Sequence, residues 1–525
     1  MIDQTPPATI GALLDDLSSR LGDAVALRAA DGRTVTHREI ANRMQRLCSA
    51  VAARGISRGA RVAILAKNSL EYVEAFGLVR LGMVVVPLNW RLGPEELRGL
   101  LIDCAPEVLI IDSAHHPVIA DIAAGLPSLR LTLCFEGPVS GFEGYEAVLD
   151  ADHAVAPIPE VVPDDPASII YTSGTTGRPK GAVISHRGAL ANMRIAQATL
   201  LQLRDGDRVL AVMPFFHVGG LWYHFFASFA AGCETTVLPE FSPASVLETM
   251  KRDRITVVHL VPTMVNALLG HESFRREDLG DLRRVFYAGS PMPTALLRRA
   301  MAALGSCEFL QSYGSTEAGI VSALAPEHHA QALKDGDGRI LGSCGIPVEG
   351  CEVRVTAAQG TLADGPVGEI EVRSDAVFRG YWQRPDATAD VCIAGWVRTG
   401  DLGYLDEDGF LFLIDRKNDM IVTGGENVFP TEVENHLMRQ EGVAEAAVFA
   451  MPHPRWIEQV TAVIVPLPGQ EIEIDRLSEK LRQELAHYKC PKQIFIADTL
   501  PKNGAGKVIR ARLRDIYSQS EEQVR

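Results

Sequence analysis

The chain has 525 residues, of which 47% are hydrophobic and 22% charged, and it carries a formal net charge of −15. This composition is typical of soluble proteins with large buried cores and excludes a disordered chain. The acidic balance argues against a general nucleic-acid binder, which would need a basic surface. A chain of this length predicts two to four domains.

Helical and strand patterns alternate over the first hundred residues. An amphipathic pattern predicts a helix over residues 8–21, a short strand follows at 24–29, and Thr36 is the expected cap of a helix running to about Arg54. The further strand candidates are 61–66, 83–87 and 108–112, with helical patterns at 69–80 and 94–102. Such alternation predicts a parallel sheet covered by helices.

A segment rich in threonine, serine and glycine, Tyr171–Gly181, follows the apolar run 167–170 and the Pro-rich linker 156–166. We expect a strand that ends in a flexible turn, then a helix from about Arg187. Glycine lets backbone N–H groups approach an anion, and hydroxyls and Lys180 add donors, so the segment predicts a site for a nucleoside triphosphate. An ordinary P-loop is rejected, because Pro179 stands where that motif needs glycine. A plain surface turn is the alternative for the segment alone.

The alternation resumes beyond this segment and predicts a second α/β layer. Its strand candidates are 208–213, 234–238, 256–260 and 282–288, and its helices are 243–253 and 294–304. Shorter β-rich runs between residues 345 and 404 predict a small barrel or distorted sheet. The helix and strand pattern from about Asp419 predicts a small separate domain.

The run 209–233 contains no Asp, Glu, Lys or Arg and is long enough to cross a bilayer. Its proline, its two histidines and the pair Gly219-Gly220 favour a buried, ligand-facing segment over a membrane helix. The N-terminus lacks the pattern of a signal peptide. The nine cysteines show no zinc-type spacing, which favours reduced core residues in the cytoplasm.

Six motifs occur in a particular order along nearly the whole chain. They are Tyr171–Gly181, Pro214–His217, Ser312–Glu317, Trp396–Asp401, Asp415–Ile421 and Pro501–Lys507. Together they resemble the adenylate-forming superfamily of acyl-CoA synthetases, peptide-synthetase adenylation domains and beetle luciferases. The resemblance implies an α/β fold with a large N-terminal domain of two α/β subdomains plus a small β-barrel, residues 1–417. A small mobile α+β domain would follow, residues 418–525.

The resemblance also implies how ATP and Mg²⁺ are bound. The triphosphate would be held by Thr172, Ser173, Gly174, Thr175, Thr176, Gly177 and Lys180. Glu317 would be the magnesium ligand, Thr316 would touch the α-phosphate, and Asp401 and Arg416 would hold the ribose. The base and phosphates would be lined by Gly289, Ser290, Pro291, Ser312, Tyr313 and Gly314. The alternatives are a solvated acid for Glu317 and a core aromatic residue for Tyr313.

Further residues are assigned to the acid and to coenzyme A. By resemblance, His217 gates a substrate pocket with Val218, Gly219 and Trp222, and the lack of an acidic partner favours an uncharged acyl or aryl group. Lys507 would be the adenylation lysine, which acts with Thr172, His217 and Glu317 in catalysis, and Asn418 would be the hinge. A core histidine and a surface lysine are the alternatives for His217 and Lys507. Contacts to coenzyme A are expected from Gly424, Gly425, Glu426, Trp456, Lys489 and Lys492. Cys490 stands where some relatives have arginine.

The sequence therefore predicts an ATP- and Mg²⁺-dependent carboxylate–CoA ligase acting on an aromatic or medium-chain fatty acid. The first rival is an adenylation enzyme that loads a separate carrier protein. A luciferase-like oxygenase and a non-catalytic nucleotide sensor are weaker alternatives, since Glu317 and Lys507 are both present. The oligomeric state stays open, with a homodimer among the options.

Overall fold

The structure is a computed structural model that describes most of the chain. It covers residues 6–172, 179–290, 292–335, 338–362, 365–417, 419–423, 426–502 and 508–522. Contacts divide the chain into two compact units: Met1–Val353 with Val372–Val397, and Arg354–Glu371 with Arg398–Arg525. This division differs from the expected boundary at residue 418, which stays a prediction.

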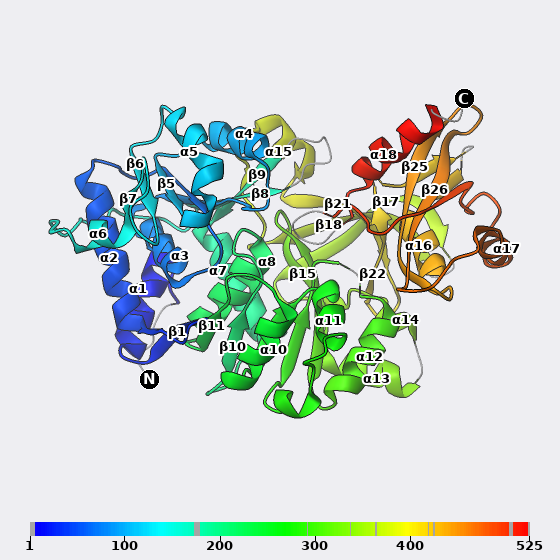
Figure 1. The fold of residues 1–525 in the computed structure, drawn as a ribbon, viewed down its shortest axis with the longest axis horizontal. Helices are drawn as coiled ribbons and strands as arrows, with labels where there is room; N and C mark the ends of the chain where they lie inside the picture. The colour runs from blue at the N-terminus through cyan, green and yellow to red at the C-terminus, as the bar shows by residue number, and fades with distance from the viewer. Residues whose placement is uncertain are drawn as a thin grey trace. The chain divides into compact units, whose positions relative to one another are not determined.

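A nine-stranded sheet forms one layer of the first unit (Figure 1). Its order is β16 (Ile346–Pro347), β15 (Gly319–Leu324), β14 (Glu308–Ser315), β13 (Arg284–Tyr287), β12 (Val257–Leu260), β10 (Arg208–Ala211), β11 (Glu234–Val237), β1 (Val25–Ala29) and β2 (Thr34–Thr36). Strands β10 to β14 pair in parallel, so their carboxyl ends lie at one edge of the sheet, where ligands of α/β proteins commonly bind.

An eight-stranded sheet forms the other layer of this unit. Its order is β19 (Gly380–Tyr381), β9 (Lys180–Ser185), β8 (Pro166–Thr172), β4 (Val84–Pro87), β3 (Arg61–Leu65), β5 (Val108–Ile111), β6 (Leu131–Cys134) and β7 (Glu143–Gly144). The central strands of both sheets pair in parallel, which confirms the predicted pair of α/β subdomains. The expected helix after the Thr/Gly-rich segment begins at His186, but β9 precedes it and was not predicted.

Helices cover both sheets. The helices of this unit are α1 (Ile10–Leu21), α2 (His37–Ala53), α3 (Leu70–Ala75), α4 (Pro94–Cys104), α5 (His116–Ala124), α6 (Tyr145–Asp150), α7 (His186–Ile195), α8 (Val218–Gly220), α9 (Phe226–Ala230), α10 (Pro243–Arg252), α11 (Pro262–Leu269), α12 (Thr294–Leu304), α13 (Pro326–Asp335), α14 (Gly338–Leu341) and α15 (Pro385–Val391). Short 3₁₀ turns are η1 (Phe76–Leu81), η2 (Ser113–His115) and η5 (Arg276–Leu279), and π-helical turns are η3 (Ala196–Leu201) and η4 (Leu221–Phe225).

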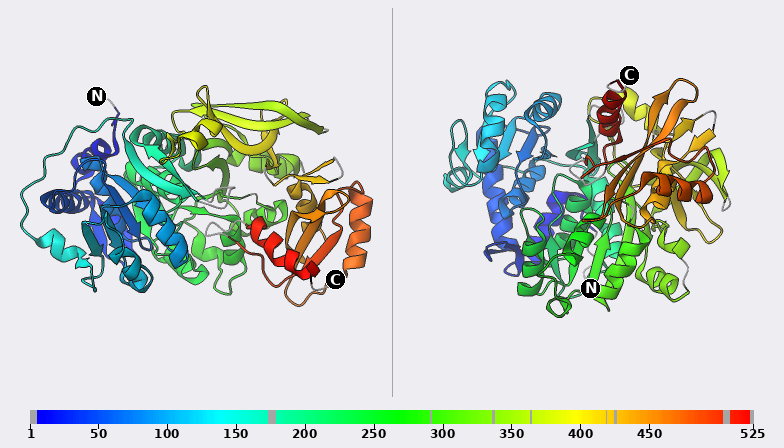
Figure 2. Two further views of the ribbon diagram at one scale, coloured as in Figure 1. Left: turned by 90° about the horizontal axis from the view of Figure 1, so that it is seen from above. Right: turned by 45° about the vertical axis from the view of Figure 1, so that its right-hand side comes forward.

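Local sequence explains where these helices begin. Thr36 and Glu39 form a capping box at α2, in which each side chain bonds the other's backbone N–H. Proline opens α10 and α11, where its missing N–H costs no helical hydrogen bond. Helices α1 and α2 pack on one another in the blue part of the chain (Figure 2).

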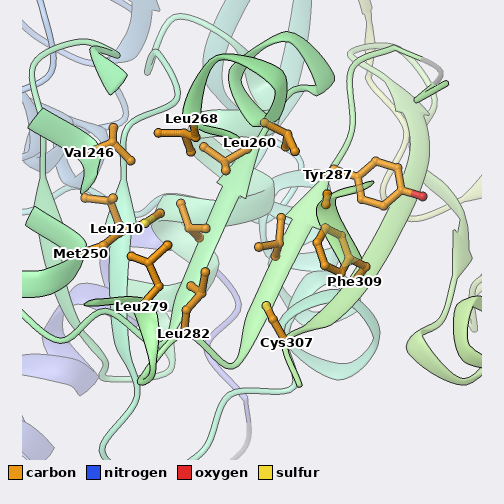
Figure 3. Packing of buried hydrophobic residues seen from close by; sticks show 14 of the residues in the cluster. Leu210, Val246, Met250, Leu260, Leu268, Leu279, Leu282, Tyr287, Cys307 and Phe309 are labelled. Carbon is orange, nitrogen blue, oxygen red and sulfur yellow. The ribbon is translucent and has the colours of Figure 1, made fainter. Parts of the chain in front are cut away.

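The core of the nine-stranded sheet is apolar and closely packed (Figure 3). Leu210 and Leu260 of the strands face Val246 and Met250 of α10 and Leu268 of α11. Burying such side chains stabilises the layer by about 1.5–3 kcal/mol each. This rigid packing holds the carboxyl-end loops of β12, β13 and β14 in place.

The remaining strands form two five-stranded sheets. One has the order β17 (Cys351–Leu362), β18 (Gly365–Ser374), β21 (Trp396–Leu405) and β20 (Cys392–Ile393), with β22 (Leu411–Arg416) on β21. Among the described residues the two ends of this sheet do not pair with each other. Of the two expected forms, a small barrel or a distorted sheet, the observed one is therefore the distorted sheet. The other has the order β24 (Glu426–Val428), β23 (Ile421–Thr423), β26 (Ile457–Pro466) and β25 (Val443–His453), with β27 (Gln493–Ile496) on β26. Its helices are α16 (Pro430–Met438), α17 (Ile474–Glu484) and α18 (Arg510–Glu522).

Candidate active site

Glu317 is the centre of a polar cluster at the carboxyl end of β8. Its Oε1 accepts hydrogen bonds from the Thr172 hydroxyl at 3.1 Å and from the Tyr381 hydroxyl at 3.0 Å. Thr172 and Lys180 face one another in the β8–β9 register. The predicted triphosphate residues that the structure describes are thus brought next to the predicted metal ligand.

Tyr381 was missed by the sequence analysis. Strand β19 places it by pairing Tyr381 with Ala182 of β9, and the Phe378 N–H donates to the Glu317 carbonyl at 2.9 Å. The Lys180 ammonium lies 5.0 Å from the centroid of the Tyr381 ring, a cation–π contact. Burial, and then the Glu317 charge, raise the pKa of Tyr381, so its hydroxyl stays a donor at neutral pH.

This cluster has the donor set for a magnesium-bound phosphate chain. A magnesium ion that keeps waters and phosphate oxygens needs only one or two protein carboxylates, and Glu317 supplies one. No group of three or more His, Cys, Asp or Glu residues in the described part of the chain could hold a metal by itself. The residues therefore fit Mg²⁺ that arrives with its nucleotide rather than a closed metal site.

The loops after β13 and β14 carry the predicted nucleotide contacts. Gly289 has φ +88, which favours glycine, and Ser290 follows it. Ser312 and Tyr313 are buried in β14. A Cβ on Gly314 would lie 2.2 Å from the Gly319 carbonyl oxygen, so only glycine fits there. Thr316 is half-buried beside Glu317.

The predicted acyl pocket lies in an aromatic region. His217 packs against Phe216 with ring centroids 4.5 Å apart, while Val218 is buried. Trp222 is fully buried, stacks on Phe226 at 4.8 Å and donates to the Ser168 hydroxyl at 3.3 Å. The run 209–233 is thus a buried segment, as predicted, and none of the described helices has the length and apolarity to span a membrane.

Asp401 and Arg416 lie opposite one another in the second unit. They are register partners in β21 and β22, and the Arg416 Nε is 3.2 Å from the Asp401 Oδ1. Asp401 is buried, while Arg416 is exposed. A buried carboxylate that keeps an arginine beside it has the acceptor oxygens that a ribose diol requires.

A charged network flanks the predicted hinge at residue 418. Arg510, which is half-buried, pairs with Asp419 and Glu434, each at 2.8 Å. Asp415 accepts the backbone N–H groups of Arg416 and Thr431, both at 2.8 Å. Burial raises the pKa of Asp415 to about 6, against the opposing effect of Arg510.

An aromatic and basic cluster lies at the turn before β26. The His453 ring stacks on Trp456 at 4.3 Å, and the Lys492 ammonium is 5.7 Å from the Trp456 ring. Lys489 instead pairs with Glu432 at 2.7 Å. Cys490 is buried in the apolar core of this unit, so it is not a surface position. Glu426 is exposed in β24, opposite Thr423.

The remaining predicted residues fall outside the described part of the chain, and their roles stay predictions. They are Ser173, Gly174, Thr175, Thr176, Gly177, Pro291, Asn418, Gly424, Gly425 and Lys507.

Comparison with known proteins gives the class. Residues 14–382 match the family model described as AMP-binding enzyme, and residues 432–507 match the model described as AMP-binding enzyme C-terminal domain. The chain therefore belongs to the AMP-binding enzymes. It is an enzyme of the AMP-forming acid–thiol ligase class, whose members use ATP, Mg²⁺ and coenzyme A.

Particular relatives cover nearly the whole chain. It is 37% identical over 496 residues to a fatty acid–[acyl-carrier-protein] ligase of Streptomyces coeruleorubidus, covering 93% of this chain and 92% of that one. It is 35% identical to the indoleacetate–CoA ligase of Aromatoleum aromaticum, covering 93% and 94%. The crystal structure of ATP-bound MatB from Rhodopseudomonas palustris superposes with a TM-score of 0.86 at 31% identity, covering 97% and 99%. The predicted family and fold are confirmed.

Proposed function

We propose that this protein is an ATP- and Mg²⁺-dependent carboxylate–CoA ligase that activates an aromatic or medium-chain acid in the cytoplasm. The observation that carries the proposal is Glu317, which is held by the hydroxyls of Thr172 and Tyr381 with Lys180 over the Tyr381 ring. A carboxylate, two hydroxyls and an ammonium at the carboxyl end of β8 suit a metal-bound triphosphate.

The reaction has two half-reactions. In the first, a carboxylate oxygen of the acid attacks the α-phosphorus of ATP, and the bond from that phosphorus to pyrophosphate breaks. In the second, the sulfur of coenzyme A attacks the acyl carbon, the thiol proton leaves, and AMP departs. Bound Mg²⁺ neutralises charge on the phosphate oxygens.

This chain's own residues bind and orient the reactants. Lys180 and the Thr172 hydroxyl would hold the phosphate chain, and Asp401 would accept the ribose hydroxyls. Lys507 would bridge the acid and the α-phosphate, where it offsets their mutual repulsion. His217 would close the pocket over the acid, which excludes water from the reacting groups.

Coenzyme A is the favoured thiol because of the cluster at Trp456. An aromatic ring with Lys492 at 5.7 Å and Arg455 at 5.8 Å offers stacking and positive charge to a phosphorylated adenine nucleotide. The rival acceptor, a carrier protein, is favoured by the relative that is named as an acyl-carrier-protein ligase.

The test is AMP and pyrophosphate release with a panel of benzoates, cinnamates and C4–C12 acids. We expect acid-dependent release that rises several-fold when coenzyme A is added, together with acyl-CoA formation. Stimulation only by a pantetheinylated carrier protein would support the rival. Absence of acid-dependent AMP release would contradict the ligase assignment.

A further inference from the structure

Two buried histidines lie side by side next to the predicted acyl pocket. His224 is in the π-helical turn η4 and His259 is in β12, and their ring centroids are 5.5 Å apart. The His259 ring also stacks on Phe286 at 4.2 Å. Their exposed fractions are 0% and 2%. Neither histidine belongs to a motif that the sequence analysis assigned to ATP, Mg²⁺ or coenzyme A.

Both ring nitrogens of each histidine have no hydrogen-bond partner within the part of the chain that the structure describes. A weak hydrogen-bonding contact with the Gly219 backbone raises the pKa of His259 and so opposes part of the effect of burial, but its geometry falls short of a full hydrogen bond. Buried polar groups in folded proteins nearly always have a partner, so these nitrogens point to a group that binds there.

Both rings are uncharged at neutral pH. Burial lowers the pKa of His224 to about 3 and that of His259 well below its usual value. A neutral imidazole offers one N–H donor and one acceptor nitrogen. The pair therefore suits an uncharged oxygen or nitrogen group, because two neutral imidazoles offer no positive charge to a second carboxylate.

Gly219 connects this pair to the predicted pocket. Between Val209 and Phe229 only His217 and Gly219 keep partial exposure, so accessible space reaches these two positions. Among the described residues outside its own stretch of backbone, a Cβ placed on Gly219 would meet only His259, whose Cε1 would be 3.5 Å away. His259 is thus the side chain that borders the open side of Gly219, and His224 lies behind it.

The backbone around His224 is also irregular. The turn η4 is π-helical and lies between α8 and α9. Such one-turn insertions are often found at functional sites, because they redirect a side chain that an ordinary helix would carry elsewhere.

We propose that His259, with His224 behind it, recognises a hydrogen-bonding oxygen on the acyl group away from its carboxylate. The favoured acids then carry a hydroxyl, ether or carbonyl oxygen rather than a plain ring or chain. This inference rests on the proposed function, because it assumes that the acid enters past His217 and Gly219. A site built for such a hydrogen bond discriminates against the acid that lacks it.

The test compares acids that differ by one oxygen. The pairs are cinnamate with 4-hydroxycinnamate and octanoate with 8-hydroxyoctanoate, and the measurement is kcat/KM for AMP release. We expect at least one oxygenated acid to be preferred by the wild-type protein by about 10- to 100-fold. His259→Leu should bring that ratio near one, and His224→Leu should lower it to a lesser extent.

Two further variants separate recognition from folding. His259→Gln keeps a donor and an acceptor and should retain most of the preference. His37→Leu is the matched control, because His37 is also buried and both of its ring nitrogens lack a partner among the described residues, but it lies in α2. It should leave the ratio unchanged.

Some outcomes would overturn the inference alone. Acid-dependent AMP release without preference in either pair, or a preference that survives in His259→Leu, would leave the ligase assignment intact and make the pair ordinary core residues. Absence of AMP release with every acid would overturn both the proposed function and this inference.

Discussion

At the scale of single residues, one glutamate oxygen is bound by two hydroxyl groups that are distant in sequence. Thr172 and Tyr381 both donate to Oε1 of Glu317, and Tyr381 also lies beneath the Lys180 ammonium. The orientation of the proposed magnesium ligand therefore depends on a residue that touches neither acid nor thiol in the proposed reaction.

Removal of the Tyr381 hydroxyl tests this arrangement. Tyr381→Phe keeps the ring next to Lys180 but deletes the 3.0 Å hydrogen bond to Glu317. A hydrogen bond to a charged group contributes about 1.5–3 kcal/mol, so we expect a ~10- to 100-fold fall in kcat/KM for pyrophosphate release and a higher Mg²⁺ requirement. The measurement is the initial rate as a function of Mg²⁺ concentration.

Tyr145→Phe is the matched control for this prediction. Tyr145 also donates to a glutamate, Glu74, at 3.1 Å, but it is a fully buried residue of α6. Its loss should leave the Mg²⁺ dependence unchanged. An unaltered rate and Mg²⁺ dependence in Tyr381→Phe would remove this tyrosine from the site.

Lys507 provides a second prediction at this scale. Lys507→Ala should slow acyl-adenylate formation by about 10²–10³-fold, because only that step brings carboxylate and α-phosphate together. Thioester formation from pre-made acyl-adenylate should continue. Lys502→Ala is the control, since Lys502 is engaged with Glu445 at 2.6 Å. Equal losses in both half-reactions would contradict the role of Lys507.

At the scale of elements, two adjacent glycines of α8 have opposite surroundings. Among the described residues outside its own stretch of backbone, a Cβ on Gly219 would meet only His259 Cε1, whereas a Cβ on Gly220 would lie 2.5 Å from the Pro214 carbonyl oxygen. The first position can therefore accept a side chain, while the second is required for close packing of the backbone.

These surroundings predict different outcomes for the two positions. Gly219→Leu should fold, bind ATP as before and shift kcat/KM toward shorter acids, because its side chain would occupy the proposed pocket. Gly220→Ala should lower the melting temperature, because backbone atoms must move. The measurements are the acid profile, the KM for ATP and thermal unfolding. A folded Gly219→Leu protein with the wild-type acid profile would place the pocket elsewhere.

Sequence patterns were sufficient for elements that depend on local chemistry. The helix from Thr36 was predicted because its capping box lies within four residues, and Glu317 was named as a candidate metal ligand because its motif is contiguous. Tyr381 was missed because its role arises from the pairing of β19 with β9, which joins distant parts of the chain. Strand β9 was missed because its short apolar run follows directly on the Thr/Gly-rich segment.

The histidine pair was inaccessible to sequence reasoning for a similar reason. His224 lay in a run predicted to be buried, but its neighbour His259 comes from a different strand, and only the packed structure shows that both lack a partner among the described residues. Similarly, no pattern indicates that Ile457, a β-branched residue at the start of β26, has φ +69 and an exposed side chain.

At the scale of the whole molecule, the two units contain buried groups with opposite responses to acid. Burial lowers the pKa of His37, His186 and His329 in the first unit to about 4. Unfolding lets each histidine take up a proton near its usual pKa of 6.5, so the stability that they contribute falls as pH falls from about 6.5 to 4. For each of these histidines, the free energy of unfolding falls by up to about 1.4 kcal/mol per unit of pH over this range.

In the second unit, the stability that Asp415 contributes changes with pH in the opposite direction. Its folded pKa is raised to about 6 from 3.8, so the folded state binds a proton that the unfolded state does not bind between about pH 4 and 6. Its contribution to stability is therefore complete below about pH 4 and is lost as the pH rises through about 6.

We expect acidification from pH 7 to pH 5 to open the first unit before the second. Hydrogen exchange with peptide resolution, corrected for the pH dependence of the chemical rate, measures each unit separately. Asp415→Asn should remove the extra stability that the second unit has at low pH. Earlier loss of protection in the second unit would contradict the assigned pKa shifts.

The distribution of thiols makes the unmodified chain suitable for site-specific labelling. Eight of the nine cysteines are buried, and Cys392 in β20 is the one with intermediate exposure. A maleimide dye applied to the native protein should therefore react first at this strand, without prior removal of other cysteines. Fluorescence or distance measurements on the working enzyme can then start from its natural sequence, with the reporter attached to the first unit.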